Sequence, residues 1–295
     1  MAEARDDPET MPALVDAGWL AACLDDADVR VLDCTVWLRP DPSGVGQTAE
    51  SGRAGWRAAH IPGGDFADLL EDLSDPASPL RFALPSARRF AEAMGELGVG
   101  DGARVVLYDR DQMVWAARLW WMLRAFGFDR AAVLDGGFAA WTAAGLPQSD
   151  QPCRYPPARF TARPRPELFT DRAGVQAALG QNGTLVLNAL RREQHAGTGG
   201  VHYGRPGHIP GSVCVPARTL TDPATGQLRP RVDLRAEFAA AGALQAARVV
   251  AYCGSGIAAC GDAFVLHLLG AREVAVYGAS LQEWAADPAV PMERD

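Results

Sequence analysis

The chain contains no lysine, and all 28 of its basic residues are arginine. A Schiff-base mechanism, a pyridoxal phosphate anchored on lysine and a phosphate-binding P-loop each need an ammonium group at a fixed place, so these three kinds of site are excluded. The 36 acidic residues outnumber the basic ones and leave a net charge of −8. This balance argues against a nucleic-acid partner and against binding to an anionic membrane surface.

Long apolar runs are also lacking. The apolar stretch around Trp115–Leu123 is interrupted by Arg118, and a membrane-spanning helix needs about 18 apolar residues or more. Residues 1–8 are polar and acidic, without the apolar segment of a secretory signal. We therefore expect a cytoplasmic protein with no membrane segment.

Cysteine is sparse and metal-binding patterns are missing. Six cysteines in 295 residues are too few for a disulfide-stabilised scaffold, and we expect reduced thiols. No Cys-x-x-Cys or His-x-x-x-His occurs, and the five histidines are scattered. A zinc site is therefore not expected, and nothing in the sequence implies another cofactor.

Several segments of the first half recur in the second half in the same order, which indicates a duplicated domain. The matching pairs are His60–Gly63 with His208–Gly211, Arg104–Asp109 with Arg248–Cys253, Val31–Cys34 with Val186–Ala189, and Val133–Trp141 with Val276–Trp284. At about 150 residues per domain, the length also predicts two domains. We place them at residues 1–150 and 167–295. Between them, residues 151–166 contain five prolines, which disfavour helix and predict an extended linker.

Within each half, short apolar runs alternate with helical patterns. The predicted strands are Val29–Cys34, Arg104–Tyr108, Ala131–Leu134, Leu185–Leu187, Arg248–Tyr252 and Glu273–Tyr277. The predicted helices are Ser86–Leu97, Val114–Phe126, Leu234–Ala241 and Ala259–Leu269. This alternation predicts an α/β fold in which each domain has a mostly parallel sheet with helices on both faces. Ligands bind at the carboxyl ends of such strands, where Asp109 and Cys253 lie.

Cys253 has the surroundings of a reactive thiol. It follows a buried strand and precedes an apolar helix in the sequence Cys253-Gly-Ser-Gly-Ile-Ala258. The free N–H groups and the positive end of the helix dipole at such a place favour the thiolate. Gly254 and Gly256 allow the backbone to curl so that several N–H groups point at the sulfur, and Ser255 adds a hydroxyl. A buried inert cysteine is the alternative, and the strand–Cys–Gly–x–Gly–helix context favours a functional one.

These motifs together resemble the tandem-domain rhodanese superfamily of 3-mercaptopyruvate and thiosulfate sulfurtransferases, over essentially the whole chain. The shared marks are His-Ile-Pro-Gly in each half, Leu134–Gly137 with Trp141, Cys253 in the second half only, and the closing Tyr277–Trp284. The resemblance implies two rhodanese-like domains, the first catalytically silent because Asp109 replaces the cysteine. It also implies that Cys253 takes sulfur from a small-molecule donor as a persulfide. Cyanide, a thiol or a thioredoxin-like protein dithiol then removes that sulfur.

The loop sequence resembles the loops of 3-mercaptopyruvate enzymes more than those of thiosulfate enzymes. It has no cation, whereas the thiosulfate dianion benefits from one. The resemblance implies that Gly254, Gly256, Ile257 and Ala258 surround the persulfide. Ser255 and His60 match the serine and histidine of the family's proton-relay triad, and Glu50 lies near its acidic member. Both histidines of the His-Ile-Pro-Gly turns, His60 and His208, have the alternative role of fixing the turn by a hydrogen bond.

The chain departs from the family pattern at several places. Ala258 stands where the family has threonine, and the carboxylate-binding arginines of the second half are not in register. Their places, with that of a neighbouring aspartate, are taken by Asn188, Leu190, Gln194 and Val201. Because a guanidinium suits a carboxylate, we take nearby arginines as replacements; each has a solvated surface residue as its alternative. These candidates are Arg191, Arg192 and Arg205.

Other functions remain as alternatives. A rhodanese-like phosphatase needs an arginine seven residues along its loop, where this chain has Ala259. A thiosulfate-preferring enzyme and a non-catalytic sulfur carrier or interaction protein stay open. Cys260 is either a resolving thiol for Cys253 or a core residue. The aromatic residues Trp115, Trp120, Trp121, Phe126 and Phe128 are predicted to form a domain interface.

Overall fold

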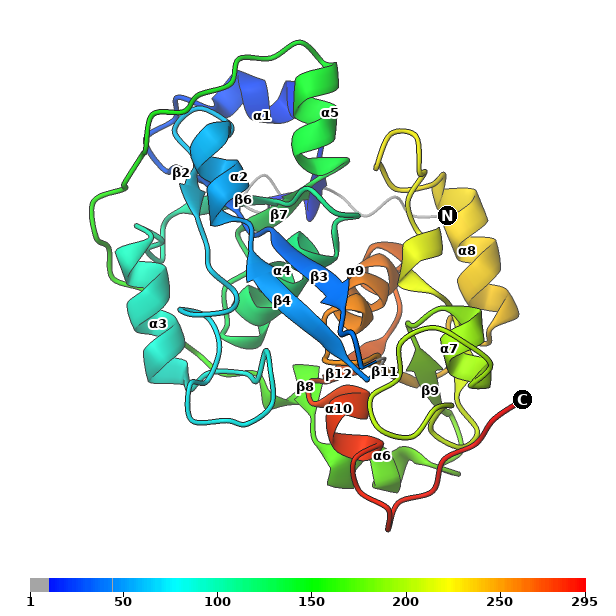
Figure 1. Cartoon of the computed structure of the whole chain (residues 1–295). Coiled ribbons are helices and arrows are strands. Elements are labelled where there is room, and N and C mark those ends of the chain that lie inside the picture. The colour runs from blue at the N-terminus through cyan, green and yellow to red at the C-terminus, as the bar shows by residue number, and fades with distance from the viewer. Residues whose placement is uncertain (1–10, 44) are drawn as a thin grey trace.

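The computed structural model describes residues 11–43 and 45–295. The polar segment at residues 1–8, on which the expectation of no secretory signal rests, lies outside the described residues. Two five-stranded sheets and a separate two-stranded hairpin make up the β structure of the described chain (Figure 1).

The first sheet is parallel throughout, with the order β1-β7-β6-β2-β5. Its strands are β1 (Leu14–Val15), β2 (Val29–Asp33), β5 (Asp65–Phe66), β6 (Arg104–Tyr108) and β7 (Ala131–Leu134). The central strands are buried along nearly their whole length. Their near-continuous apolar sequences match a sheet that is covered on both faces.

The second sheet repeats this arrangement. Its order is β10-β9-β11-β12-β8. When the strands of each sheet are counted along the chain, both sheets have the order first, fifth, fourth, second, third. The strands are β8 (Phe169–Thr170), β9 (Thr184–Asn188), β10 (Val213–Cys214), β11 (Arg248–Tyr252) and β12 (Glu273–Tyr277). The prediction of a duplicated, parallel α/β fold is therefore confirmed.

Helices cover both faces of each sheet. In the first half these are α1 (Ala17–Cys23), α2 (Arg53–Ala58), α3 (Ala87–Glu96), α4 (Val114–Ala125) and α5 (Gly137–Ala143). In the second half they are α6 (Arg172–Ala178), α7 (Arg192–Ala196), α8 (Arg231–Ala240), α9 (Ala258–Leu269) and α10 (Ser280–Trp284), with single 3₁₀ turns at Pro166–Leu168 and Ala217–Thr219. Helix α8 begins three residues before its predicted start, directly after Pro230, whose fixed φ suits the entry to a helix.

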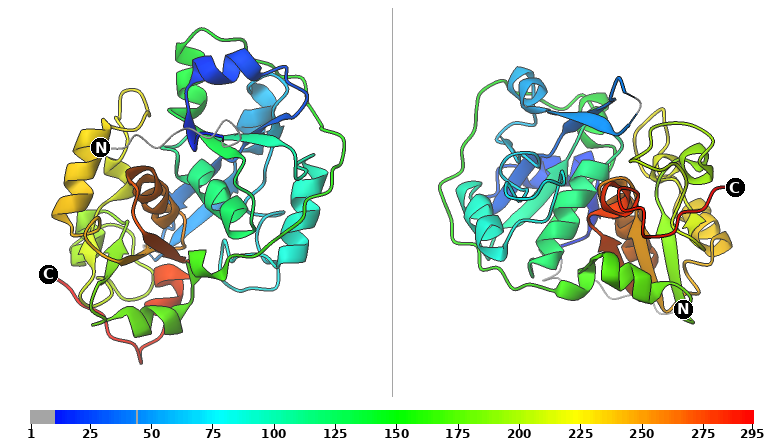
Figure 2. Two further views of the ribbon diagram at one scale, coloured as in Figure 1. Left: turned by 180° about the vertical axis from the view of Figure 1, so that it is seen from behind. Right: turned by 60° about the horizontal axis from the view of Figure 1, so that its bottom comes forward.

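The two halves share one apolar core where α4 lies against α9 (Figure 2). The Trp120 ring meets Phe264 edge-on at 4.9 Å between centroids, and the Trp121 indole donates to the Leu168 carbonyl at 2.9 Å. The predicted aromatic interface is thus confirmed for these two tryptophans. It is wrong for Phe126, which stacks on Phe90 inside the first half.

Phe128 also lies away from the interface. Its ring packs on Phe160 of the linker. Residues 151–165 contain no helix or strand and run along the outside of the first half (Figure 2). The Tyr155 hydroxyl accepts from the Val31 N–H at 2.9 Å, and Ala158 N donates to Gly95 O at 2.9 Å. The linker is therefore extended and attached to the first half.

A hairpin that the sequence pattern did not indicate reaches from the first half to the second (Figure 1). Its strands, β3 (Val36–Pro40) and β4 (Gln47–Ser51), are antiparallel. Near its tip, Gly46 N donates to His202 O at 2.7 Å. The hairpin therefore supplies a first-half wall to the space between the two halves.

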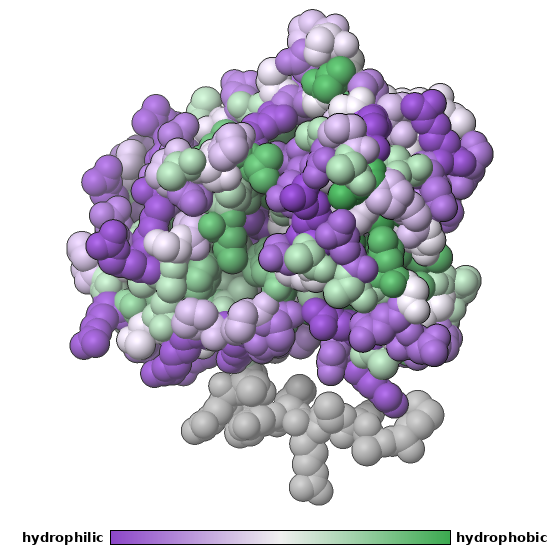
Figure 3. Space-filling model, turned by 90° about the horizontal axis from the view of Figure 1, so that it is seen from below, coloured by the Kyte–Doolittle hydropathy of each residue, from purple (hydrophilic) through white to green (hydrophobic). Residues whose placement is uncertain are grey.

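The surface seen from below is mostly polar, with apolar residues in small separate groups (Figure 3). The exposed large apolar side chains among the described residues are Trp37, Val45 and Val232. None of the helices in the described part of the chain is both long and apolar enough to cross a membrane.

Candidate active site

Cys253 lies at the carboxyl end of the central strand β11, immediately before the loop that leads into α9. The first residues of α10 hold this loop from behind. The Cys253 N–H donates to Ser280 Oγ at 3.0 Å, and the Cys253 carbonyl accepts from Leu281 N at 3.0 Å. Gln282 N donates in the same way to the Gly254 carbonyl at 2.9 Å. The cysteine is thus fixed by backbone contacts on both sides.

The sulfur of Cys253 accepts one backbone hydrogen bond. Gly256 N lies 3.1 Å from Sγ, whereas the sequence predicted several N–H groups at this place. Gly256 has a φ of +80°, and a Cβ there would lie 2.5 Å from the Gly278 carbonyl oxygen. Only glycine combines the left-handed backbone with this close approach. The predicted role of Gly256 in shaping the loop therefore has a clear geometric basis.

The Cys253 sulfur opens on a cavity of about 550 Å³ between the two halves. Cys253, Ser255, Ile257 and Ala258 form one wall. The other walls are Leu38, Pro40 and Gln47 of the hairpin, Asp111, Gln112, Val114 and Trp115 of the first half, and Ala189–Arg191, Gln194, Gly200, Val201, Tyr203, Ala217 and Arg218 of the second. Most of these residues were not predicted as site residues. The hairpin and the loops that carry them are distant in sequence and meet only in the folded chain.

Tyr203 is a residue that the sequence analysis missed. Its ring lies directly against Gly254, so that a Cβ at that position would collide with it. Its hydroxyl donates to Gln47 Oε1 at 3.1 Å and so joins the second half to the hairpin. Burial raises the pKa of the Tyr203 phenol well above its usual range, with a further contribution from Cys253. Tyr203 therefore stays neutral and closes one side of the cavity.

The cavity wall contains two cations and one acid among the residues the structure describes. The cations are Arg191 and Arg218, and the acid is Asp111. Burial raises the pKa of Asp111, and the charge of Arg218 opposes that rise. Gln194 is held in place, because its Oε1 accepts from Arg191 N at 3.3 Å and its Nε2 donates to Val201 O at 2.8 Å. Arg191 and Arg218 are the cationic groups of the wall that can face an anion.

The three predicted arginines have different surroundings. Arg191 lines the cavity, and its role in binding the substrate stays a prediction. Arg192 opens α7 on the exposed surface and is not part of the cavity wall. Arg205 donates to the carbonyls of Trp284, Ala285, Asp287 and Val290 at 2.6–3.1 Å. Its guanidinium binds the end of α10, so its predicted role in substrate binding is wrong.

The structure does not bring the predicted proton-relay residues together. Ser255 lines the cavity. His60 is fully buried elsewhere, with Nδ1 2.8 Å from the Trp56 carbonyl and Nε2 3.1 Å from the Gln151 carbonyl. Glu50 pairs with Arg39 at 3.5 Å on the exposed hairpin. His60 therefore has the geometry of its alternative role, fixing the turn, and not of a catalytic residue.

His208, the second-half counterpart of His60, stacks on His195 with 3.9 Å between ring centroids. Asp295 lies close enough for the three side chains to be considered as metal ligands. Asn188 Oδ1 accepts from Leu190 N, so its Nδ2 donates to Nδ1 of His195 at 3.1 Å. The ring proton of neutral His195 is then on Nε2, which leaves no free lone pair on either nitrogen. This arrangement fits a buried stack and does not fit a metal site.

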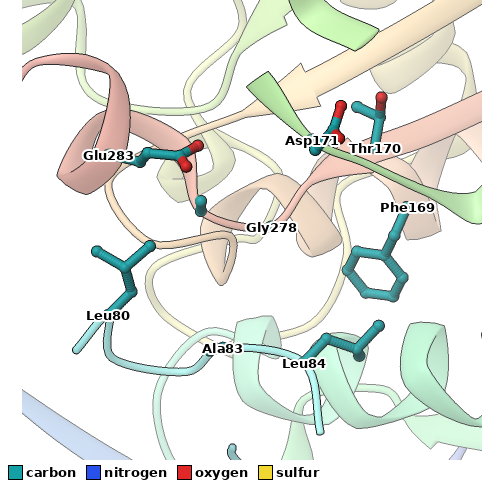
Figure 4. Close-up of a pocket in the computed structure, with 9 residues that line it drawn as sticks. Leu80, Ala83, Leu84, Phe169, Thr170, Asp171, Gly278 and Glu283 are labelled. Atoms are coloured by element: carbon teal, nitrogen blue, oxygen red, sulfur yellow. The ribbon is translucent and has the colours of Figure 1, made fainter. Parts of the chain in front are cut away.

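A second cavity of about 520 Å³ lies where β12 leads into α10 (Figure 4). Its wall consists of Leu80, Ala83, Leu84, Phe169, Thr170, Asp171, Gly278, Ala279 and Glu283. None of the predicted site residues is among them. Gly278, one of its wall residues, packs against Gly256 of the loop that carries Cys253.

The first half has an equivalent loop around Asp109, at the end of β6 and before α4. Its Oδ1 accepts from the N–H groups of Asp111 and Met113, and its Oδ2 from those of Trp115 and Ala116, at 2.9–3.0 Å. Burial raises the pKa of Asp109 to about 7, against the bonds from Ala116, Asp111 and Met113, which lower it. The Asp109 side chain thus lies in the first half at the position that the Cys253 side chain has in the second half.

Comparison with known proteins agrees with this duplicated architecture. The Rhodanese-like domain family matches the chain twice, over residues 16–144 and 176–287. A probable 3-mercaptopyruvate sulfurtransferase of Pseudomonas aeruginosa is 38% identical over 287 residues, covering 95% of this chain and 97% of the relative. The thiosulfate sulfurtransferase of Gallus gallus is 33% identical, covering 92% and 93%.

A solved structure extends the comparison to the fold. The crystal structure of the 3-mercaptopyruvate sulfurtransferase SseA of Escherichia coli superposes with a TM-score of 0.81 at 30% sequence identity, covering 92% of this chain and 99% of that one. The two matches to the family model cover both halves, and the second of them includes the loop that carries Cys253. The chain therefore belongs to the rhodanese-like domain family, within which it groups with the tandem-domain sulfurtransferases.

Proposed function

We propose that this protein transfers a sulfane sulfur from a small donor to an acceptor through a persulfide on Cys253. The observation that carries the proposal is the placement of the Cys253 sulfur in the wall of a cavity, 3.1 Å from the Gly256 N–H and beside the start of α9. A backbone donor and a helix N-terminus both stabilise negative charge on sulfur. The resting thiolate and the persulfide anion carry that charge in turn.

The reaction proceeds in two balanced steps. The Cys253 thiolate attacks the sulfur of 3-mercaptopyruvate, an S–S bond forms and the C–S bond breaks. The electron pair of the C–S bond leaves on carbon as the enolate of pyruvate, which takes up the former thiol proton. In the second step the acceptor, cyanide or a thiolate, attacks the outer sulfur and releases the Cys253 thiolate. Splitting the transfer in this way replaces one difficult step by two easier ones.

3-Mercaptopyruvate is the donor that the cavity supports best. No cation lies in the loop itself, at residues 253–258. The two cations of the cavity wall, Arg191 and Arg218, suit a single carboxylate placed away from the sulfur. The relatives from Pseudomonas aeruginosa and Escherichia coli are named for the same donor. A thiosulfate-preferring enzyme is the second candidate, favoured by the name of the Gallus gallus relative.

The first half is proposed to be catalytically silent. Asp109 holds the position of Cys253, and its carboxylate oxygens are already occupied by four N–H groups. It has no sulfur to form a persulfide. The first half contributes instead the hairpin and the 111–115 segment of the cavity wall.

We propose a small thiol, cyanide or the dithiol of a thioredoxin-like protein as acceptor, and the cytoplasm as location. The cysteines of the chain support a reducing compartment, because all six are free thiols. The cavity lies between the two halves and is open to small molecules at the sulfur.

The deciding experiment is the intact mass of the reduced protein after separate exposure to 3-mercaptopyruvate and to thiosulfate, with Cys253→Ser as the control. We expect one added sulfur from 3-mercaptopyruvate and none in the variant. A gain from thiosulfate alone would keep the persulfide and change the donor. No gain from either donor would contradict the enzymatic proposal and leave a sulfur carrier or interaction protein.

A further inference from the structure

Arg118 is a first-half residue that reaches the catalytic loop of the second half. It lies in the middle of α4 and is 1% exposed. One guanidinium nitrogen, Nη2, donates to the Phe82 carbonyl at 2.8 Å. The other, Nη1, lies 3.5 Å from the Gly256 carbonyl oxygen and 3.8 Å from Cys260 Sγ. This side chain therefore connects α4 directly to the loop that presents Cys253.

The positive charge of Arg118 has no carboxylate partner. In the part of the chain that the structure describes, its contacts are two carbonyl oxygens, one sulfur and the ring face of Phe169, 5.1 Å from the guanidinium carbon. Phe169 also forms part of the wall of the second cavity (Figure 4). Burying a cation without an anion costs free energy. A negative group close to Arg118 would lower this cost.

One thiol, that of Cys260, contacts Arg118 directly. Burial raises the pKa of Cys260 to about 11, against the opposing effect of Arg118. Cys260 is thus a neutral thiol at pH 7, and its sulfur donates to the Gly256 carbonyl at 3.1 Å. This bond gives Cys260 a structural role in the core. The remaining candidate for a negative charge is Cys253, whose sulfur lies across Gly256 from Arg118.

Gly256 is the link between Arg118 and Cys253. Its N–H points at Cys253 Sγ, and its carbonyl faces Arg118 and Cys260. The residue is therefore held at both ends, with Gly278 packed behind it. A rotation of this segment would move the N–H away from the sulfur and the carbonyl away from the guanidinium together.

We propose that Arg118 is a positioning residue for the sulfur transfer: it fixes Gly256 so that its N–H faces Cys253, and its charge balances the negative sulfur. The inference rests on the proposed function, because it concerns the same sulfur. It assigns the silent half a direct part in the chemistry, since the balancing cation comes from α4. The 3.5 Å contact from Arg118 to the Gly256 carbonyl is long for a hydrogen bond. The charge of Arg118 therefore contributes more to stabilising the negative sulfur than this hydrogen bond does.

Other charged and titratable groups face the same region and are kept constant in the test. Cys260 comes from α9, and Tyr203 packs against Gly254. Arg81 lowers the pKa of Tyr203, against the larger effect of burial. Asp111 and Arg218 line the cavity in front of the sulfur. None of them is altered by a substitution at position 118.

The test measures the rate at which iodoacetamide alkylates Cys253, followed by peptide mass between pH 5 and pH 9. Three variants separate the possible roles of the side chain. Arg118→Met removes both charge and donors, Arg118→Gln keeps donors without charge, and Arg118→Lys keeps charge. Arg124→Met is the matched control, because Arg124 lies on the same helix and pairs with Asp129 at 3.0 Å, without contact to the loop.

We expect Arg118→Met and Arg118→Gln to alkylate about tenfold more slowly at neutral pH, with the midpoint of the pH profile about one unit higher. Arg118→Lys should recover most of the rate, and Arg124→Met should match the unaltered protein. Equal midpoints in the unaltered protein and Arg118→Gln would overturn the proposal. If Arg118→Met fails to fold, Arg118→Lys and Arg118→Gln decide, and equal midpoints in that pair would likewise overturn it.

Alkylation needs no sulfur donor, so this test is independent of the proposed function. A protein that gains no sulfur from either donor but shows the shift at position 118 would contradict the function and keep the role of Arg118. A protein that gains sulfur normally in Arg118→Gln, with an unchanged alkylation profile, would do the reverse.

Discussion

Asp109 and Cys253 occupy equivalent positions at the carboxyl ends of the central strands of the two sheets, each followed by a loop and a long buried helix. Four backbone N–H groups bind the Asp109 carboxylate, whereas one binds the Cys253 sulfur. Both loops are suited to negative charge. In the first half the chain itself supplies an acidic group to these N–H donors, and in the second half the proposed reaction adds a second sulfur to Cys253 at the equivalent position.

The cationic part of the cavity provides the first prediction. Arg191→Gln and Arg218→Gln should each raise the KM for 3-mercaptopyruvate about tenfold with a smaller change in kcat, because they remove a charge that faces the carboxylate and not the reacting sulfur. Arg192→Gln is the control, since Arg192 adjoins Arg191 but lies outside the cavity wall. Steady-state kinetics at constant ionic strength measure the effect. An unchanged KM in both cavity variants would show that the donor binds elsewhere.

Arg205 should behave as a structural residue. Its guanidinium donates to four carbonyls around the end of α10, and Arg205→Met leaves these acceptors without their donor. We expect the free energy of unfolding to fall by about 2–4 kcal/mol, with the KM for the donor unchanged in the folded fraction. Urea unfolding and steady-state kinetics give the two values. A raised KM at unchanged stability would restore the substrate-binding role expected from the sequence.

The regular parts of the fold could be predicted from sequence because they depend on local patterns. Buried parallel strands give short continuous apolar runs, and β6, β7, β11 and β12 have the predicted bounds. The position of Cys253 between β11 and α9 follows from the same patterns. Duplication added a second, independent signal, since segments such as His60–Gly63 recur in the second half as His208–Gly211.

The cavity could not be predicted in the same way, because its walls come from segments that are distant in sequence. The hairpin β3–β4 is half exposed and lacks a clear apolar alternation, so nothing in its sequence marked Gln47 as a wall residue. Tyr203 lies in a glycine-rich loop with no regular structure. Arg118 was noted as the charge that interrupts an apolar run, and that buried charge within a helix was the available signal for a functional role.

The stack of His195 on His208 predicts a loss of stability in acid. Burial, assisted by the nearby His208, lowers the pKa of His195 to about 4, below the value of about 6.5 in an unfolded chain. Between these values the unfolded chain takes up a proton that the folded chain does not, so stability is present above about pH 6.5 and is lost as the pH falls towards 4. His195→Phe keeps a ring on His208 and removes this proton.

The variant should therefore lose less stability than the unaltered protein between pH 7 and pH 5, by about 1 kcal/mol once partial exposure is allowed for. Urea midpoints at the two pH values measure the difference. His267, whose pKa burial also lowers to about 4, is present in both proteins and cancels. Parallel losses in the two proteins would contradict the assignment to His195.

Asp262 predicts the opposite dependence on pH. It is fully buried in α9, and both carboxyl oxygens lack a hydrogen-bond partner among the described residues. Burial raises its pKa far above the usual range. Above about pH 4 the unfolded carboxyl loses a proton that the folded one keeps, so the folded state loses stability as the pH rises. Asp262→Asn, which cannot titrate, should equal the unaltered protein near pH 4 and exceed it at pH 8 by on the order of 1–3 kcal/mol.

Gly256 and Gly270 form a matched pair that separates backbone strain from collision at the catalytic loop. Their φ values are +80° and +81°, but a Cβ at Gly256 would lie 2.5 Å from the Gly278 carbonyl oxygen, whereas one at Gly270 has nothing within 4 Å. Both alanine variants should lose about 1 kcal/mol of stability from the left-handed backbone. Gly256→Ala must also displace the segment whose N–H faces Cys253, so its rate of sulfur uptake should fall about a hundredfold, as expected for a misplacement near 1 Å. Gly270→Ala should take up sulfur at the normal rate.

Mass-detected sulfur uptake from the donor measures the rate, and urea unfolding measures the stability. Equal uptake rates in Gly256→Ala and Gly270→Ala would show that the Gly256 N–H does not hold the reacting sulfur in place.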